Sequence, residues 1–209
     1  MKTDPSPIVR KQRNVTGSPP APDHFDLVPD ALLAGRAADG DTAAFEALAR
    51  RYGPLMRACA RRLTGSHADA DDVVQESLVQ AWKQLDTLRD GDAVKSWLLR
   101  ITGSRSIDHV RRRKTHSELG DLDQKVDAGS GRGEGGNPES AALSGSRMDA
   151  LKNAVASLPE EQRRCWVLKQ FNDQSYEEIA QTLNISVASV RGRLARARVT
   201  LAREMEGWR

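Results

Sequence analysis

SYEEIAQTLNISVASVRGRLARAR, residues 175–198, contains the starts of two helices with a tight turn between them. Ser175 and Glu178 have the spacing of a capping box, in which the serine hydroxyl caps the Glu178 amide and the glutamate reaches back to the serine. The first helix is short and stops at Asn184, a residue that tolerates the left-handed conformation common at helix ends. Ser186 then caps a second helix. This order of elements predicts a helix-turn-helix.

The second helix of this stretch separates apolar, small and basic side chains. At about 100° per residue, Val187, Val190, Leu194, Ala197 and Leu201 face inward, Ala188, Ser189, Gly192 and Ala195 lie opposite, Arg191 and Arg198 flank one side, and Arg193, Arg196 and Arg203 flank the other. Small side chains let a helix approach base edges in the major groove, while arginines reach phosphates or guanine. A solvated helix face would show the same arginines, and a repressor would fit equally well.

Two more helices are predicted directly before the helix-turn-helix. The segment Met148–Leu158 carries apolar residues on one side. Pro159 then occupies the first turn of the next helix, where Glu160 and Glu161 complement the helix dipole. Because that helix continues to Phe171, the C-terminal part of the chain is expected to be a small domain of four helices.

Three helices are predicted in the first half of the chain. Their apolar stripes are Phe45, Leu48, Ala49, Tyr52, Leu55, Met56, Cys59, Ala60 and Leu63, then Val74, Leu78, Ala81, Trp82 and Leu85, and finally Val94, Trp97, Leu98 and Ile101. Gly65 ends the first helix, and Asp69 resembles the N-terminal cap of the second. After a loop over residues 87–92, the third helix runs toward the basic run at residues 111–114.

Composition divides the chain into four segments. Six of the nine prolines lie in the first 29 residues, and glycine and acidic residues accumulate after the basic run. Proline disfavours regular structure in the first stretch, and the second has too few large apolar residues to order itself. We therefore expect an all-α protein with a disordered Pro-rich tail over residues 1–29, a helical domain over 30–114, an acidic Gly-rich linker over 115–145 and a helix-turn-helix domain over 146–209.

Positive charge is concentrated in the two predicted helical domains. Lys and Arg set against Asp and Glu give a net charge of −1 for residues 1–44, +4 for 45–113, −3 for 114–145 and +3 for 146–209. The total of +3 is too small to indicate a nucleic-acid partner by itself. Its distribution places two mildly basic blocks on either side of an acidic connector.

The sequence lacks the motifs of an enzyme or a metal site. No Gly-rich phosphate loop follows a strand, no Cys and His residues have metal-ligand spacing, and the four histidines do not cluster with a nucleophile. We therefore expect no catalytic residue, no metal and no cofactor. Cys59 and Cys165 lie inside apolar patterns and are predicted to be buried reduced thiols, with a disulfide or a redox switch as the alternative.

No leader peptide or membrane span is predicted. The basic residues near the N-terminus are not followed by an apolar segment, and no window approaches the roughly 18 apolar residues of a membrane helix. We therefore expect a cytoplasmic protein without membrane insertion.

Three groups of motifs, in this order along the chain, resemble one known family. The first is DDVVQESLVQAW at residues 71–82, and the second is SWLLRI at 96–101, followed by Asp108 and Arg111-Arg112. The third combines LPEEQR at 158–163, SYEEIA at 175–180 and VRGRLARAR at 190–198. On these residues the chain resembles the extracytoplasmic-function (ECF) subfamily of the sigma-70 family of RNA polymerase sigma factors, across nearly the whole of both helical domains.

The resemblance implies a non-enzymatic protein that binds core RNA polymerase, directs it to specific promoters and assists promoter melting. The implied partners are the clamp helices of the largest polymerase subunit, the flap of the second largest, promoter DNA and an anti-sigma factor. The residues expected to bind core polymerase are Asp72, Gln75 and Glu76; those for the minus-ten element are Trp97, Arg105, Arg111, Arg112 and Arg113; and those for the minus-thirty-five element are Ser186, Ala188, Ser189, Arg191, Arg193, Arg196 and Arg198. The loop at residues 87–92 matches the family's segment that captures an unstacked base.

The residues by themselves leave alternatives open. Trp97 lies on an apolar stripe, where core packing is the main expectation and base stacking the second. The basic run at residues 111–114 fits either phosphate contacts or a solvated helix end. A stand-alone helix-turn-helix regulator and a helical polymerase-binding protein without promoter contacts are the other classes of function that remain.

Three features depart from the family's pattern. Thr102-Gly103-Ser104 stands where the family often has Ala-Arg-Asn, which affects the expected upstream contacts to the minus-ten element. Asn184 replaces the usual turn glycine, a substitution that the backbone accepts. The Pro-rich tail has no counterpart in the shared pattern.

Overall fold

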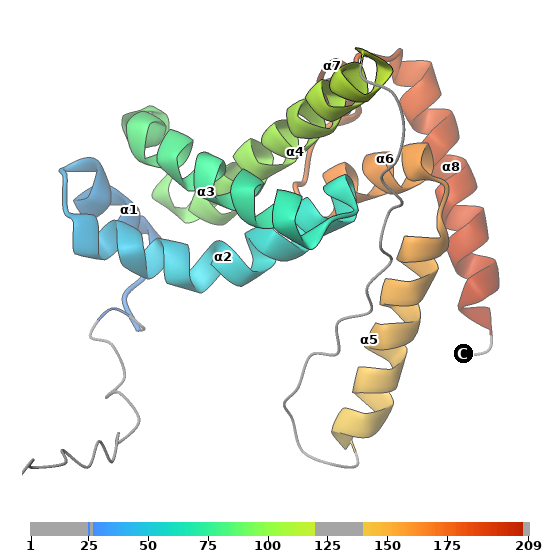
Figure 1. The fold of residues 1–209 in the computed structure, drawn as a ribbon. Coiled ribbons are helices and arrows are strands. Elements are labelled where there is room, and N and C mark those ends of the chain that lie inside the picture. Colours follow the sequence, from blue (N-terminus) through green and yellow to red (C-terminus); the bar gives the residue numbers. More distant parts are fainter. Residues whose placement is uncertain (1–24, 26, 120–139, 207–209) are drawn as a thin grey trace, which may run out of the picture.

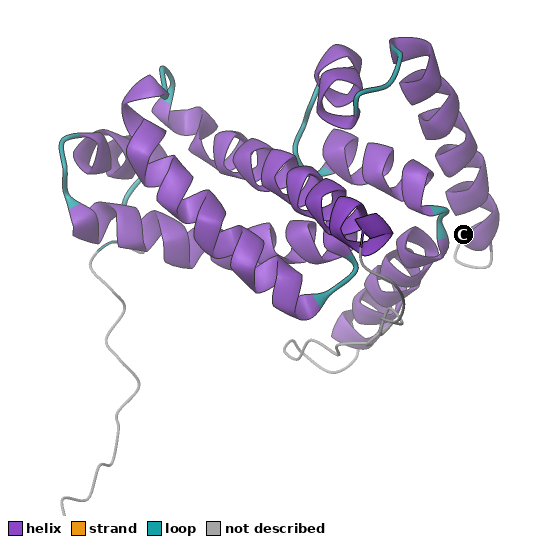
Figure 2. Ribbon diagram, turned by 45° about the horizontal axis from the view of Figure 1, so that its top comes forward, coloured by secondary structure: helices purple, strands orange, loops and turns teal. Residues whose placement is uncertain are grey.

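The computed structural model describes residue 25, residues 27–119 and residues 140–206, and every regular element within them is a helix (Figure 2). The α-helices are α1 (Asp30–Ala38), α2 (Thr42–Thr64), α3 (His67–Gln84), α4 (Val94–Leu119), α5 (Ser140–Ser157), α6 (Glu160–Gln170), α7 (Tyr176–Leu183) and α8 (Val187–Glu204), with the short 3-10 helices η1 (Leu85–Thr87) and η2 (Gly91–Ala93) before α4. Helices α1 to α4 form an N-terminal domain, and α5 to α8 form a C-terminal domain (Figure 1). The predicted all-α fold with two helical domains is confirmed. None of these helices could cross a membrane, because none is both long and apolar enough.

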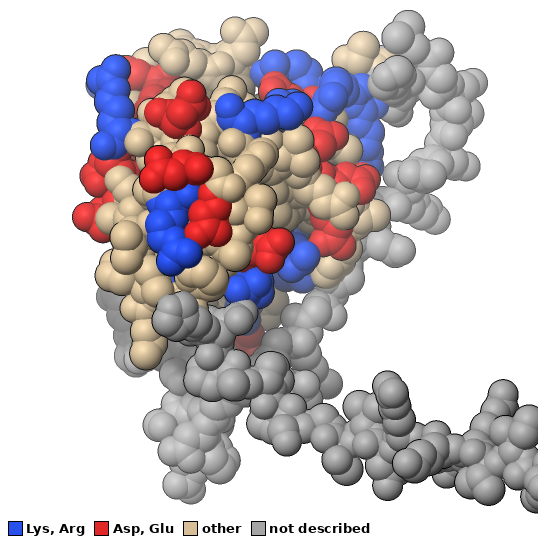
Figure 3. Space-filling view, turned by 90° about the vertical axis from the view of Figure 1, so that its left-hand side faces the viewer, with Lys and Arg blue, Asp and Glu red and all other residues tan. Residues whose placement is uncertain are grey.

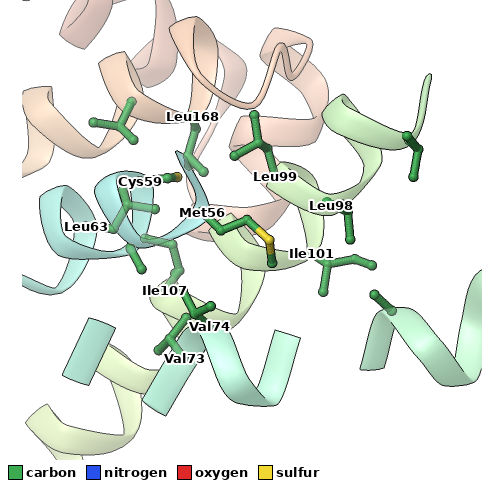
Figure 4. Close-up of a cluster of buried hydrophobic side chains, with 14 of the residues drawn as sticks. Met56, Cys59, Leu63, Val73, Val74, Leu98, Leu99, Ile101, Ile107 and Leu168 are labelled. Atoms are coloured by element: carbon green, nitrogen blue, oxygen red, sulfur yellow. The ribbon is translucent and has the colours of Figure 1, made fainter. Parts of the chain in front are cut away.

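Helices α2, α3 and α4 build the N-terminal domain by packing on one another. Their contact buries Met56 and Leu63 of α2, Val73 of α3 and Leu98 of α4, each at most 2% exposed (Figure 4). Burial of a side chain of this size contributes about 1.5–3 kcal/mol to the free energy of folding. The apolar stripes predicted from the sequence therefore meet in one core.

The boundary between α2 and α3 follows the predicted break but not the predicted cap. Gly65 ends α2 in the left-handed conformation at φ 77°, as expected of a glycine after a helix. Helix α3 then begins at His67, and the Ser66 hydroxyl accepts a hydrogen bond from the Asp69 amide at 3.3 Å. The cap predicted at Asp69 is therefore wrong, because a serine three residues earlier already satisfies that amide. The Asp69 carboxylate instead pairs with Arg113 of α4 at 2.7 Å.

Helix α1 was not predicted as an element. It begins directly after Pro29 and buries one large apolar side chain, Leu33, and two alanines, Ala34 and Ala37. Asp30 at its start forms an ion pair with Arg51 of α2 and accepts a hydrogen bond from the Tyr52 hydroxyl. Nine residues with so few large apolar side chains give a weak periodic signal, so the contacts that hold α1 are visible only in three dimensions.

The C-terminal domain contains the predicted caps. Ser175 and Glu178 form the complete capping box, Asn184 adopts the left-handed conformation at φ 53°, and the Ser186 hydroxyl accepts from the Ser189 amide. Pro159 differs slightly from prediction, since it lies at the N-cap position of α6 rather than within its first turn. Helix α5 packs against α8 through Ala154 and Val155, joined by Leu158 directly after the helix, and these meet Ala197 and Leu201 of α8. The helix-turn-helix is therefore fixed by local caps on one side and by α5 on the other.

Both helices that border the predicted linker are longer than expected. Helix α4 continues past the basic run to Leu119, and α5 begins at Ser140, so each extends into the range 115–145. The remainder of that range, and residues 1–24 of the predicted tail, lie outside the described residues. The two domains also touch, because α2 contacts α6 and α4 contacts α7.

We expect Asn184→Ala to lower the free energy of unfolding by about 1–2 kcal/mol, because alanine pays the steric cost of the left-handed conformation that Asn184 adopts. Asn184→Gly is the matched variant, and it should leave stability within about 0.5 kcal/mol of wild type. Urea denaturation followed by circular dichroism measures both. Equal stability of the alanine and glycine variants would contradict the role assigned to this turn.

Candidate nucleic-acid and polymerase interfaces

Helix α8 presents an exposed face of small and basic side chains. Its N-terminus is held by Ser186, whose hydroxyl accepts from the Ser189 amide at 3.1 Å. Of the residues predicted to contact DNA, those that are exposed are Ser186, Ala188, Arg191, Arg196 and Arg198, and Ser189 is half-buried. Arg198 donates to the Tyr176 hydroxyl at 3.2 Å, and this hydrogen bond lowers the pKa of Tyr176. The face that the sequence predicted is therefore brought together on one helix.

Arg193 is placed differently from the other arginines of α8. Its side chain is only 19% exposed and pairs with Glu161 of α6 at 2.7 Å. The Arg193 guanidinium also contacts the Cys165 thiol, whose pKa is raised because burial outweighs this contact. Arg193 therefore connects α8 to α6, a role that the helical wheel could not reveal because Glu161 lies on a separate helix.

The residues predicted to bind polymerase share one exposed stripe of α3. Asp72, Gln75 and Glu76 are all exposed, and Val79, one turn further on, is 56% exposed. Their spacing of three and four residues places them on one side of the helix. Asp71 points elsewhere and pairs with Arg57 of α2 at 2.6 Å. The stripe combines carboxylate, amide and apolar groups, which is suited to a protein partner.

An open groove joins this stripe to α4. Its lining residues are Gln75, Glu76, Val79, Gln80, Lys83, Gln84, Arg105 and Arg112, and its volume is about 680 Å³. Arg105 donates to the Gln80 side chain, and Arg112 lies 3.7 Å from the Glu76 carboxylate. Two residues predicted for polymerase and two predicted for the minus-ten element thus line the same groove.

The remaining residues predicted for the minus-ten element are spread along α4. Trp97 is half-buried and packs against the apolar core, eight residues or about 12 Å before Arg105. Arg111 pairs with Asp108 at 3.4 Å, and Arg113 pairs with Asp69. The structure therefore separates Trp97 from the arginines and gives each of these two arginines an acidic neighbour.

Comparison with known proteins matches both domains to one family. Residues 48–116 match the family described as Sigma-70 region 2, and residues 148–201 match Sigma-70, region 4. The ECF RNA polymerase sigma-E factor of Escherichia coli K12 is 30% identical over 181 residues, which cover 85% of this chain and 94% of that protein. The sigma-E factor of Salmonella typhimurium LT2 is 31% identical over 181 residues, which also cover 85% of this chain and 94% of that protein. The chain belongs to the ECF sigma factors.

The sigma factor's fold is also found in a solved structure of a relative. The sigma factor RpoE of Bartonella quintana, in complex with the anti-sigma factor NepR, is 24% identical, covers 78% of this chain and 96% of its own length, and has a TM-score of 0.56. This likeness concerns the fold alone, whereas the family matches and the sequence relatives establish a sigma factor of transcription initiation that associates with RNA polymerase and binds DNA. A stand-alone helix-turn-helix regulator is not favoured.

The loop of this sigma factor between α3 and α4 is held by α1. A Cβ atom at Gly91 would lie 2.7 Å from the Ala31 Cα, so only glycine fits at this point. Asp90 caps η2 by accepting from the Asp92 amide, while Arg89 and Asp90 are exposed. The importance of Gly91 was missed in the sequence, because its neighbour is 60 positions away along the chain.

The end of the N-terminal domain that lies away from the C-terminal domain carries charges of both signs. On the face toward the left of Figure 1, Lys and Arg alternate with Asp and Glu over the surface (Figure 3). No group of three or more His, Cys, Asp or Glu residues in the described parts of the chain could hold a metal ion. The candidate surfaces of this sigma factor thus remain the three described above, namely the α3 stripe, the α3–α4 groove and the outer face of α8.

We expect Arg193→Ala to lower the free energy of unfolding by about 1–3 kcal/mol, because it removes a charged hydrogen-bonding group that joins α8 to α6. The matched variant Arg191→Ala should change stability by less than about 0.5 kcal/mol, because its side chain is exposed. Thermal melts monitored by circular dichroism compare the two. If both arginines prove equally dispensable, the structural role of Arg193 is wrong.

Proposed function

We propose that α3 and α8 divide the work of this sigma factor between polymerase and promoter. The observation that carries the proposal is the outer face of α8, where exposed Arg191, Arg196 and Arg198 border small residues on a helix fixed by a capped turn. Such a face fits the major groove, because small residues permit close approach and arginines reach guanine or phosphate. In this proposal Arg193 positions α8 and does not contact the minus-thirty-five element directly.

The α3 stripe is proposed to bind the clamp helices of the largest polymerase subunit. Asp72, Gln75 and Glu76 offer hydrogen-bond acceptors, and exposed Val79 and half-exposed Trp82 add apolar area. Apolar side chains beside a few polar ones are typical of the centre of a protein interface. The C-terminal domain is proposed to contact the flap of the second-largest subunit at the same time.

The α4 side of the groove between α3 and α4, together with the loop at residues 87–92, is proposed to receive the minus-ten element, while the α3 side is left to polymerase. Arg105 and Arg112 line the groove, and Arg111 and Arg113 extend the basic surface along α4. Binding of a single strand shifts the duplex toward the open form without covalent chemistry, so no catalytic residue is required. Trp97 is proposed to support this surface from within the core.

An anti-sigma factor is proposed as a further partner. The relative from Bartonella quintana is a sigma factor held by the anti-sigma factor NepR, and it shares this fold. Because a sigma factor acts where RNA polymerase is, we also propose that the protein works in the cytoplasm. We propose no cofactor for binding to polymerase, promoter or anti-sigma factor.

We expect the double variant Gln75→Ala with Glu76→Ala to weaken binding of core polymerase about tenfold or more, because both side chains lie exposed on the proposed docking stripe. Glu46→Ala on α2 is the matched control, since it removes an exposed carboxylate outside the stripe. Fluorescence anisotropy with labelled sigma factor and purified core enzyme measures both. Equal affinity of the double variant and the control would exclude this stripe from the interface.

We expect Arg191→Ala with Arg196→Ala to reduce transcription from promoters selected in vitro with the wild-type holoenzyme. The cost should be about 1–3 kcal/mol for each arginine that contacts guanine and less for each that contacts phosphate. The control is Arg203→Ala, which removes an exposed arginine about 10 Å further along α8. Run-off transcription with core polymerase is the measurement, and unchanged promoter choice would show that this face is only solvated.

A further inference from the structure

An interior glycine of α4 marks the place where the C-terminal domain touches the N-terminal domain. A Cβ atom at Gly103 would lie 2.0 Å from the Asn172 Nδ2 and 2.9 Å from the Leu168 Cδ2. Both neighbours belong to the C-terminal domain, at and beyond the end of α6. Any larger residue at position 103 would therefore have to displace the Asn172 side chain from its present place.

The Asn172 side chain is inserted into the N-terminal domain. It is fully buried, its Nδ2 donates to the Leu99 carbonyl at 2.7 Å, and its Oδ1 accepts from the Cys59 thiol at 3.1 Å. Leu99 lies one helical turn before Gly103, so the missing side chain at Gly103 leaves the Leu99 carbonyl open to a second donor. Cys59, Leu99 and Gly103 thus form a socket for one amide of the other domain.

Apolar contacts surround this socket. Leu168 of α6 lies beside Cys59 of α2 and near Leu99 of α4 (Figure 4), and all three are at most 2% exposed. The Arg62 guanidinium lies 4.8 Å from the centre of the Phe171 ring, and the Arg62 carbonyl accepts from Arg163 at 3.2 Å. The apolar core cluster of the N-terminal domain therefore continues into α6, α7 and α8.

Basic groups of α4 are occupied at the edge of the same interface. Arg100 pairs with Glu178 at 3.0 Å, and Lys114 pairs with Glu160 at 3.6 Å. Arg111, which is proposed to face promoter DNA, donates to the Thr182 carbonyl of α7 at 3.3 Å. In this arrangement the C-terminal domain engages part of the basic surface of α4, although each of these three side chains stays about half exposed.

We propose that the Asn172 side chain and the socket of Cys59, Leu99 and Gly103 form an autoinhibitory latch that closes the free sigma factor and must open before it binds a promoter. The need to open rests on the proposed function. Two promoter elements about 25 base pairs apart are separated by about 85 Å of duplex, whereas α4 and the helix-turn-helix lie in contact here. The closed form cannot reach both elements.

The latch is tested with Gly103→Ala in the full chain. Alanine favours a helix more than glycine does, so the variant should remain folded while its Cβ excludes Asn172. The matched control is Gly53→Ala, an interior helical glycine of the same domain whose Cβ would meet nothing within 4 Å. Asn172→Ala is the second test, because it empties the socket from the other side.

Alkylation of Cys59 reports whether the latch is open. Burial raises the pKa of the Cys59 thiol to about 12, so the closed form should react very slowly with iodoacetamide. Peptide mass spectrometry should show Cys59 alkylated about tenfold faster or more in Gly103→Ala and Asn172→Ala than in wild type or Gly53→Ala. The rate at Cys165, which contacts Arg193 within its own domain, should stay unchanged and so exclude unfolding. Equal protection of Cys59 in all four proteins would overturn the latch.

The second measurement is binding of the free protein to a mixed-sequence 30-base-pair duplex at low salt. Opening releases Arg100, Arg111 and Lys114, so Gly103→Ala should bind about threefold tighter or more than Gly53→Ala. An unchanged affinity, despite faster alkylation, would overturn the autoinhibitory role. Failure of wild-type protein to direct core polymerase would contradict the proposed function instead, and neither measurement on the free protein depends on that result.

Discussion

A buried amide must find hydrogen-bond partners, and Asn172 finds both of its partners in the other domain. Water would satisfy the same amide in an open form, so these two bonds contribute only about 0.5–1.5 kcal/mol each to closure. The apolar contacts of Leu168 and Leu99 supply the larger share of the free energy, and the amide sets their register. The buried amide therefore specifies one geometry for an interface that is otherwise apolar.

Helix α4 carries the consequences of this interface. Its consecutive residues Leu98 and Leu99 are both buried, one toward the core of its own domain and the other at the interface with α6. A helix buried on two sides has little exposed surface left for other partners. On α4 that exposed surface consists of its side of the α3–α4 groove and the basic run at residues 111–114. Residues that bind the C-terminal domain and residues proposed to bind DNA therefore lie within one turn of each other, so that occupancy of one surface affects the other.

What the sequence could predict depended on how far apart the interacting residues lie. The caps at Ser175, Asn184 and Ser186 were predicted correctly, because each is decided within three or four residues. The roles of Arg193 and Gly103 were not predicted, since their partners Glu161 and Asn172 lie 32 and 69 positions away. In the sequence, Gly103 stands out only as a departure from the family's pattern near the minus-ten contacts. Fold class follows from periodicity, whereas the division of arginines into structural and available groups requires the tertiary contacts.

The helical glycines also divide into structural and available positions. Each costs about 1 kcal/mol relative to alanine, so a use for the missing side chain is expected. Gly103 is used within the molecule, where Asn172 fills the space. Gly192 on α8 meets only Arg196, at an ordinary contact distance of 3.5 Å, and so has no comparable use inside the chain. Open space alone decides nothing, because Gly35 and Gly53 are equally unobstructed. What distinguishes Gly192 is its setting among small residues that are bordered by exposed arginines. This setting would allow a DNA groove to approach the helix closely, which explains a glycine at position 192 but not at Gly35 or Gly53.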